Sequence, residues 1–107
     1  MLKVESLPLT TTIIMIKHRR QWLTKHGANT LAQLRRAMCE QAYSLNRRQT
    51  DTVLTALDWV ANYLPTLSNR STDSPIADRK DMDCLHHLRT AANILRQPNL
   101  NAALANL

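Results

Sequence analysis

The scarcity of glycine is the feature that most constrains this chain, because Gly27 is the only glycine among its 107 residues. A β-sheet protein of this length needs many tight turns with positive φ angles, which glycine adopts most readily. The chain also lacks phenylalanine, so aliphatic residues must fill the core, which suits packed helices better than sheets. The sequence therefore predicts an all-α fold class, a small bundle of four to five helices in a single domain over residues 1–107.

The amino-terminal segment contains an early proline. Pro8 disfavours a helix around it, so residues 1–10 are expected to form a flexible arm. A first helix is predicted over residues 11–26, opened by a capping threonine and ended by Gly27, since glycine suits the left-handed position after a helix. A short strand is the alternative for residues 10–16, because a short run of threonine and isoleucine does not separate strand from helix.

Two leucine-rich stretches predict the next pair of helices. The first, over residues 30–45, repeats apolar residues at the i, i+3, i+4 spacing of an amphipathic helix. The second, over residues 47–64, has a broader apolar face and is expected to be the central helix of the bundle. The apolar positions are Leu31, Leu34, Met38, Ala42 and Leu45 in the first stretch, and Val53, Leu57, Val60 and Leu64 in the second.

The carboxyl-terminal third begins with a polar segment. Residues 65–74 are rich in threonine, serine and asparagine, and we expect them to form an exposed loop. Ser74 followed by Pro75 is a helix start signal, so a further helix is predicted over residues 75–96. A last short helix should follow Pro98. The residues expected to be buried in the longer helix are Cys84, Leu85, Leu88, Ala91, Ala92 and Leu95.

Charge is distributed unevenly along the chain, whose formal net charge is +6. Residues 1–50 carry nine lysines and arginines against two glutamates, whereas residues 51–107 carry five against six aspartates. Clustered positive charge attracts polyanions over distances of about 8–10 Å at ordinary ionic strength. The expected partner is therefore nucleic acid, either DNA or RNA, or an acidic protein surface.

The basic side chains of the first half are the candidate binding site. Nucleic-acid binding requires them to converge on one surface, where each contact with a phosphate would release counterions. Otherwise they would form a solvated face that keeps the protein soluble. The candidate nucleic-acid-binding residues are Lys17, Arg19, Arg20, Lys25, Arg35, Arg36, Arg47 and Arg48.

A leucine-striped helix that meets a second helix through Ser44-Leu45-Asn46-Arg47-Arg48-Gln49 resembles the helical hairpin that opens the bacterial HU-type nucleoid proteins. The resemblance covers residues 30–64, about a third of the chain. The β-sheet and the proline-tipped DNA-binding arms of that family have no counterpart after Leu64. Membership of the family is therefore not inferred, and the resemblance implies only a pair of connected helices.

The remaining chemistry-bearing residues predict no active site. Four residues with metal-binding side chains lie close together in sequence, namely Asp83, Cys84, His86 and His87. On a helix they offer pairs of ligands on one face, whereas a structural zinc site takes four ligands. Neither a metal nor another cofactor is predicted. One glycine cannot build a phosphate-binding glycine loop and no GxSxG motif is present, so we expect no enzymatic activity. The two cysteines, Cys39 and Cys84, are expected to be reduced and partly buried.

Two further expectations concern location and assembly. The apolar run at residues 13–16 is too short for a membrane span or a secretory signal, which predicts a cytoplasmic protein that does not enter the membrane. The core of a domain this small has little room for the large rings of Trp22, Trp59 and Tyr63. Rings that stay exposed would form an apolar patch, so a homodimer is expected. The predicted function is a small regulatory or accessory protein that binds nucleic acid. The alternative is a protein-binding adaptor, chaperone or inhibitor that acts on an acidic or apolar partner surface.

Overall fold

The computed structural model describes the backbone of residues 2–69 and 75–107 and the side chains of residues 14–67 and 76–107. Within these ranges the chain forms an all-α bundle without strands, which confirms the predicted fold class. No described helix is both long and apolar enough to cross a lipid bilayer. The elements are α1 (Leu2–Glu40), α2 (Arg47–Tyr63), the 3-10 helix η1 (Leu64–Asn69), α3 (Pro75–Ile94) and α4 (Pro98–Ala105).

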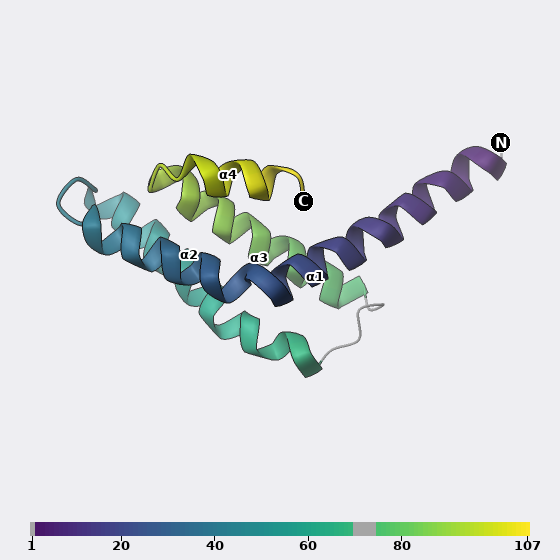
Figure 1. Cartoon of the computed structure of the whole chain (residues 1–107), viewed down its shortest axis with the longest axis horizontal. Helices are drawn as coiled ribbons and strands as arrows, with labels where there is room; N and C mark the ends of the chain where they lie inside the picture. Colours follow the sequence, from purple (N-terminus) through teal and green to yellow (C-terminus); the bar gives the residue numbers. More distant parts are fainter. Residues whose placement is uncertain (1, 70–74) are drawn as a thin grey trace.

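Helix α3 is the centre of the bundle, because it packs against α1, α2 and α4 (Figure 1). The sequence analysis assigned this place to residues 47–64, which form α2 and contact α1, η1 and α3. The correction follows from the apolar face of α3, where small and branched side chains alternate and let three helices approach. The residues predicted to be buried are buried, namely Cys84, Leu85, Leu88, Ala91 and Ala92, followed by Leu95 after the helix end, and Asp81 is buried beside them.

Helix α1 is longer than predicted and continues through both residues expected to limit it. It begins at Leu2, so residues 2–10 are helical rather than the expected arm, and the strand alternative for residues 10–16 is also wrong. Pro8 lies in the second turn, beyond the first four residues whose amides have no partner inside a helix, so α1 continues there despite the loss of one hydrogen bond. Figure 1 shows this first part of α1 projecting away from the other helices, and Ile14 and Met15 are 63% and 44% exposed there.

Gly27 does not end α1 but lies buried inside it. A Cβ atom at this position would come within 2.7 Å of Leu64 Cδ2, well inside van der Waals contact. The lack of a side chain at Gly27 therefore leaves room for Leu64 of η1 to pack closely against α1. The φ angle of Gly27 is not in the left-handed region. The left-handed position occurs instead at Arg96, with φ 53°, immediately beyond the end of α3.

A buried ionic network joins three elements to α1. Arg20 Nε donates to Asp81 Oδ2 at 2.9 Å, and Arg20 Nη1 donates to the Leu67 carbonyl at 3.2 Å. The Tyr63 hydroxyl donates to the other oxygen of Asp81. Burial and the neighbouring Asp81 carboxylate raise the pKa of Tyr63, which keeps its proton available for this bond. The network connects α1, α2, η1 and α3 around one carboxylate.

The first half of the loop expected over residues 65–74 is helical. Residues 64–69 form the 3-10 helix η1, and Leu67 is buried against the core, so the prediction of an exposed segment is wrong there. Burial of Leu67 fixes the carbonyl that accepts from Arg20. Residues 70–74 lie outside the described part of the chain.

Replacing Asp81 with alanine is expected to lower the free energy of unfolding by about 3–5 kcal/mol, because the buried Arg20 guanidinium would lose its counter-charge. Urea denaturation followed by circular dichroism measures the change. Asp83→Ala is the matched control, since Asp83 is an exposed carboxylate of the same helix, and its effect should stay below about 0.5 kcal/mol. A loss under about 1 kcal/mol for Asp81→Ala, typical of a surface pair, would contradict the role given to the network.

Candidate nucleic-acid interface

Two of the eight predicted binding residues lie inside the protein. Arg19 and Arg20 are 7% and 5% exposed, and each forms an ion pair with an aspartate of α3, Arg19 with Asp78 at 3.0 Å and Arg20 with Asp81 at 2.9 Å. Arg19 also approaches the Leu107 carbonyl at 3.5 Å. A guanidinium already neutralised and enclosed does not reach a phosphate, so these two residues are removed from the candidate site.

The other predicted residues of α1 lie on its exposed face. Lys17, Lys25, Arg35 and Arg36 are all exposed. At about 100° per residue these four side chains fall within an arc of about 100°, on the side of α1 opposite Arg19, Leu23 and Leu34. The four residues form one basic face, which we call the α1 face. Helical periodicity therefore brings together charges that are up to 19 positions apart in sequence.

The last two predicted residues begin α2. Arg47 and Arg48 are exposed in its first turn, after the capping box in which the Asn46 side chain accepts from the Gln49 amide at 2.8 Å and the Gln49 side chain accepts from the Asn46 amide at 3.0 Å. The amino end of a helix carries partial positive charge, so the positive charges of two arginines in the first turn are unfavourable for the helix. An anion bound at this point would relieve that repulsion.

None of the six exposed candidates forms an ion pair within the described ranges, where the two ion pairs found are those of Arg19 and Arg20. Glu40, Asp51 and Asp58 are exposed on the same two helices but neutralise none of the candidates by direct contact. The charge of the α1 face and of the α2 start is therefore available to a partner.

One basic residue was missed by the sequence analysis. Arg96 is exposed beyond α3, and it lines a polar hollow of about 100 Å³ together with residues of the α1–α2 turn. A hydrogen bond from Gln41 Nε2 to the Leu95 carbonyl at 2.6 Å connects the α1–α2 turn to the turn that follows α3. Only the folded bundle places Arg96 beside a turn more than fifty residues earlier, so no local sequence signal could have revealed it.

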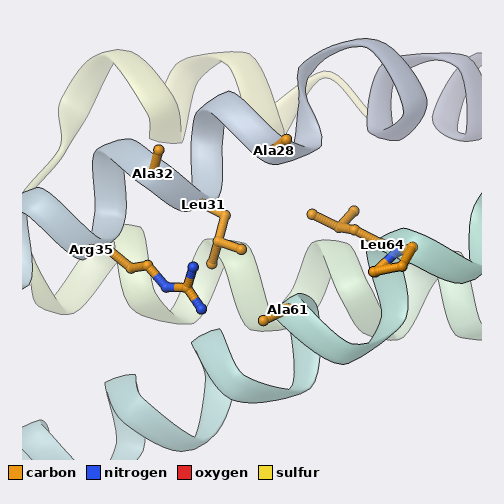
Figure 2. A pocket seen from close by; sticks show the side chains of 7 residues that line it. Ala28, Leu31, Ala32, Arg35, Ala61 and Leu64 are labelled. Atoms are coloured by element: carbon orange, nitrogen blue, oxygen red, sulfur yellow. The ribbon is translucent and has the colours of Figure 1, made fainter.

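An apolar groove runs between α1 and the end of α2. Figure 2 shows Leu31 and Leu64 reaching into it from opposite sides, with Arg35 as its one charged side chain. Its volume is about 620 Å³, and a smaller hollow lined by Leu23, Thr24 and Leu67 continues it along α1. The residues shared by the two hollows are Ala28, Leu64 and Pro65.

The histidine cluster of α3 does not form a metal site. Among the residues that the structure describes, no three histidine, cysteine, aspartate or glutamate side chains are arranged to hold an ion. Cys84 is buried, which raises the pKa of its thiol to about 12, so it is unsuited to bind metal as a thiolate. Cys39 is exposed, contrary to the expectation of partial burial.

The fold also lowers the pKa of His87. This histidine packs against Trp59, with ring centroids 4.9 Å apart, and lines a hollow with Asp51, Thr55 and His86. Burial lowers the pKa of His87 below its ordinary value of 6.5, the neighbouring His86 lowers it further, and Asp83 partly opposes both. The folded protein therefore favours the neutral imidazole.

Comparisons with models of protein families, with curated proteins and with solved structures give no match for this chain. The function is therefore inferred from the geometry of the chain itself.

Acidification from pH 7.5 to 5 is expected to reduce stability in part through His87. The unfolded chain binds the proton near pH 6.5 whereas the folded chain binds it only at lower pH, so stability falls as the pH drops below that value. Thermal unfolding of the wild type and of His87→Gln at both pH values measures this contribution. The variant should lose less stability than the wild type, while His18→Gln, which alters an exposed histidine of α1, should lose as much. An equal loss in His87→Gln and the wild type would contradict the assignment.

Proposed function

We propose that this chain is a small non-enzymatic accessory or regulatory protein that binds nucleic acid through the α1 face and the start of α2. The proposal is supported by one observation above others. Six of the eight basic side chains singled out from the sequence are exposed without an ion pair among the described residues, and four share one side of α1. The binding residues of the proposal are Lys17, Lys25, Arg35, Arg36, Arg47 and Arg48.

The dimensions of the α1 face suit a phosphate backbone. Lys17 and Arg36 are separated by 19 positions of one helix, or about 28 Å at 1.5 Å per residue. Each strand of a duplex carries a phosphate about every 3.4 Å along the helix axis, so this length matches about eight steps. Contacts of lysine and arginine with phosphates position a protein without reading bases. The proposed binding is therefore mainly independent of sequence.

Charge reversal on the α1 face tests the proposal. Arg35→Glu combined with Arg36→Glu is expected to weaken binding to random-sequence DNA or RNA at least tenfold at 50 mM salt. The slope of the logarithm of affinity against the logarithm of salt concentration should fall by the contribution of about two phosphate contacts. Fluorescence anisotropy at 50 and 200 mM salt provides both quantities. The thermal midpoint should stay nearly unchanged, because exposed charges contribute little to stability.

A control variant separates position from net charge. Arg79→Glu combined with Lys80→Glu changes the charge by the same amount on α3 and should leave binding within about threefold, because neither residue belongs to the α1 face or to the start of α2. If the wild type binds neither nucleic acid at 50 mM salt, or if both double variants bind equally well, the proposal is wrong.

The groove between α1 and α2 favours a second function, that of an adaptor for a helical partner. Two antiparallel helices leave a furrow into which the ridge of a third helix fits, and the alanines at positions 28, 32 and 61 keep it shallow and accessible. Arg35 would pair with an acidic side chain within the partner's apolar stripe. We propose an amphipathic helix with one acidic residue as the occupant in this case.

A designed peptide tests this second function. An 18-residue amphipathic helix with leucines on one face and one central glutamate should bind the wild type and bind Ala28→Glu at least tenfold more weakly, because the new carboxylate fills and repels the groove. Ala102→Glu, at an exposed alanine of α4, is the matched control and should bind normally. Isothermal titration calorimetry measures all three. Equal binding to Ala28→Glu and the wild type would exclude the groove as the docking site.

Self-association is the remaining part of the proposal. The projecting part of α1 exposes Ile14 and Met15, and apolar side chains that find no cover within one chain are often covered by another. We propose a homodimer formed through this part of α1. The expected cytoplasmic location stays a prediction.

A further inference from the structure

The turn between α1 and α2 presents an aromatic side chain among arginines. Tyr43 is fully exposed and lies between the basic end of α1 and the start of α2. Its ring makes no contact with another ring in the described part of the chain, where the aromatic pairs involve Trp22, Trp59 and Tyr63. An aromatic face held in water without a partner is available to stack on a flat ligand.

Tyr43 is presented on a turn whose backbone is held in place. The Gln41 amide donates to the Ala37 carbonyl at 3.0 Å and the Ser44 amide donates to the Gln41 carbonyl at 2.9 Å. The Gln41 side chain fastens the turn to Leu95, and the capping box of Asn46 fixes its other end. Binding to a turn already ordered loses little conformational entropy. This turn is therefore suited to presenting a stacking residue.

Arginines of three elements flank this turn, either in sequence or across the hollow that Arg96 shares with it. Arg36 lies on the last turns of α1, Arg47 and Arg48 begin α2, and Arg96 follows α3. Arg96 keeps a left-handed backbone that non-glycine residues seldom adopt, which is stabilised by a bond from the Gln97 amide to the Ala92 carbonyl at 3.0 Å. We call the four arginines together with Tyr43 the turn cluster.

The polar hollow beside the turn cluster offers hydrogen-bonding groups with free capacity. Gln41 and Gln49 line it with Ser44 and Arg96. Gln41 uses its amide nitrogen on Leu95 and Gln49 uses its oxygen on Asn46, so within the described residues the oxygen of Gln41 and the nitrogen of Gln49 remain without a partner. One acceptor and one donor of this kind match the edge of a nucleobase.

We propose that the turn cluster binds single-stranded nucleic acid by stacking an unpaired base on Tyr43 while the four arginines contact the flanking phosphates. This inference rests on the proposed function and specifies its substrate class. Bases of a duplex are stacked on one another and do not offer a free face to a side chain, whereas bases of a single strand do. Tyr43 thereby adds a preference for single strands over duplexes, which the phosphate contacts of the α1 face do not provide.

Removal of the ring tests the inference. Twelve-nucleotide poly(dT) and poly(rU) strands and a twelve-base-pair duplex are titrated with wild type, Tyr43→Ala and Tyr43→Phe by fluorescence anisotropy at 50 and 150 mM salt. Tyr43→Ala is expected to bind the single strands about 5- to 160-fold more weakly, the range found for the loss of one stacked base, with the same salt dependence and an unchanged affinity for the duplex. Tyr43→Phe keeps the aromatic face and should bind as the wild type does.

Further variants separate the possible failures. Leu54→Ala removes another exposed apolar side chain and should bind every probe normally. Arg96→Ala should lower the slope of the salt dependence by the contribution of about one phosphate contact. If Tyr43→Ala binds single strands as well as the wild type, or loses single strand and duplex equally, the stacking role is wrong while the phosphate contacts stand. If the wild type binds no probe, the proposed function fails and this inference fails with it. Circular dichroism verifies that each variant is folded.

Discussion

The bundle depends on the pairing of buried arginine with aspartate. A guanidinium enclosed by protein is tolerated only when a carboxylate and further hydrogen bonds compensate its lost hydration, and Asp81 receives both Arg20 and Tyr63. This requirement fixes how α1 is rotated about its axis relative to α3. Once Arg19 faces Asp78 of α3, periodicity places Lys17, Lys25 and Arg35 about 120–160° away around the helix. The internal ion pairs thus decide which of the positive charges a partner can reach.

Much of the fold could be predicted because apolar spacing dominates where helices pack. The apolar stripe of α2 and the Ser74-Pro75 start signal of α3 predicted helices that begin at Arg47 and Pro75, and the six apolar residues expected to be buried in the α3 segment are buried. The first helix was misjudged because Pro8 and Gly27 were interpreted through local preference alone. Helix α1 continues through Pro8 although a proline there removes one hydrogen bond, and a glycine inside a helix is retained when a side chain such as Leu64 must come close. The second effect depends on packing that no local rule contains.

The candidate site was predicted less well, and the reason is electrostatic. Composition counts charges without their partners, so Arg19 and Arg20 looked equivalent to Arg35 and Arg36. A signal for the difference was present, since Arg19 falls on the apolar side of α1 with Leu23, and Asp78 and Asp81 are spaced one helical turn apart on α3. The partners are nevertheless about sixty residues apart in sequence. Pairing over such distances, like the approach of Arg96 to the α1–α2 turn, emerges only when the chain is folded.

The projecting part of α1 illustrates how a packed domain can support structure beyond its own boundary. An isolated helix of about a dozen residues is marginal in water, because forming its first turn costs more than each later turn returns. Residues 2–13 avoid that cost, since they extend a helix already anchored by Leu23, Leu34 and the buried arginines. The bundle acts as a template from which the helical backbone of this segment elongates, so contacts more than one turn away support a helix that would not form by itself.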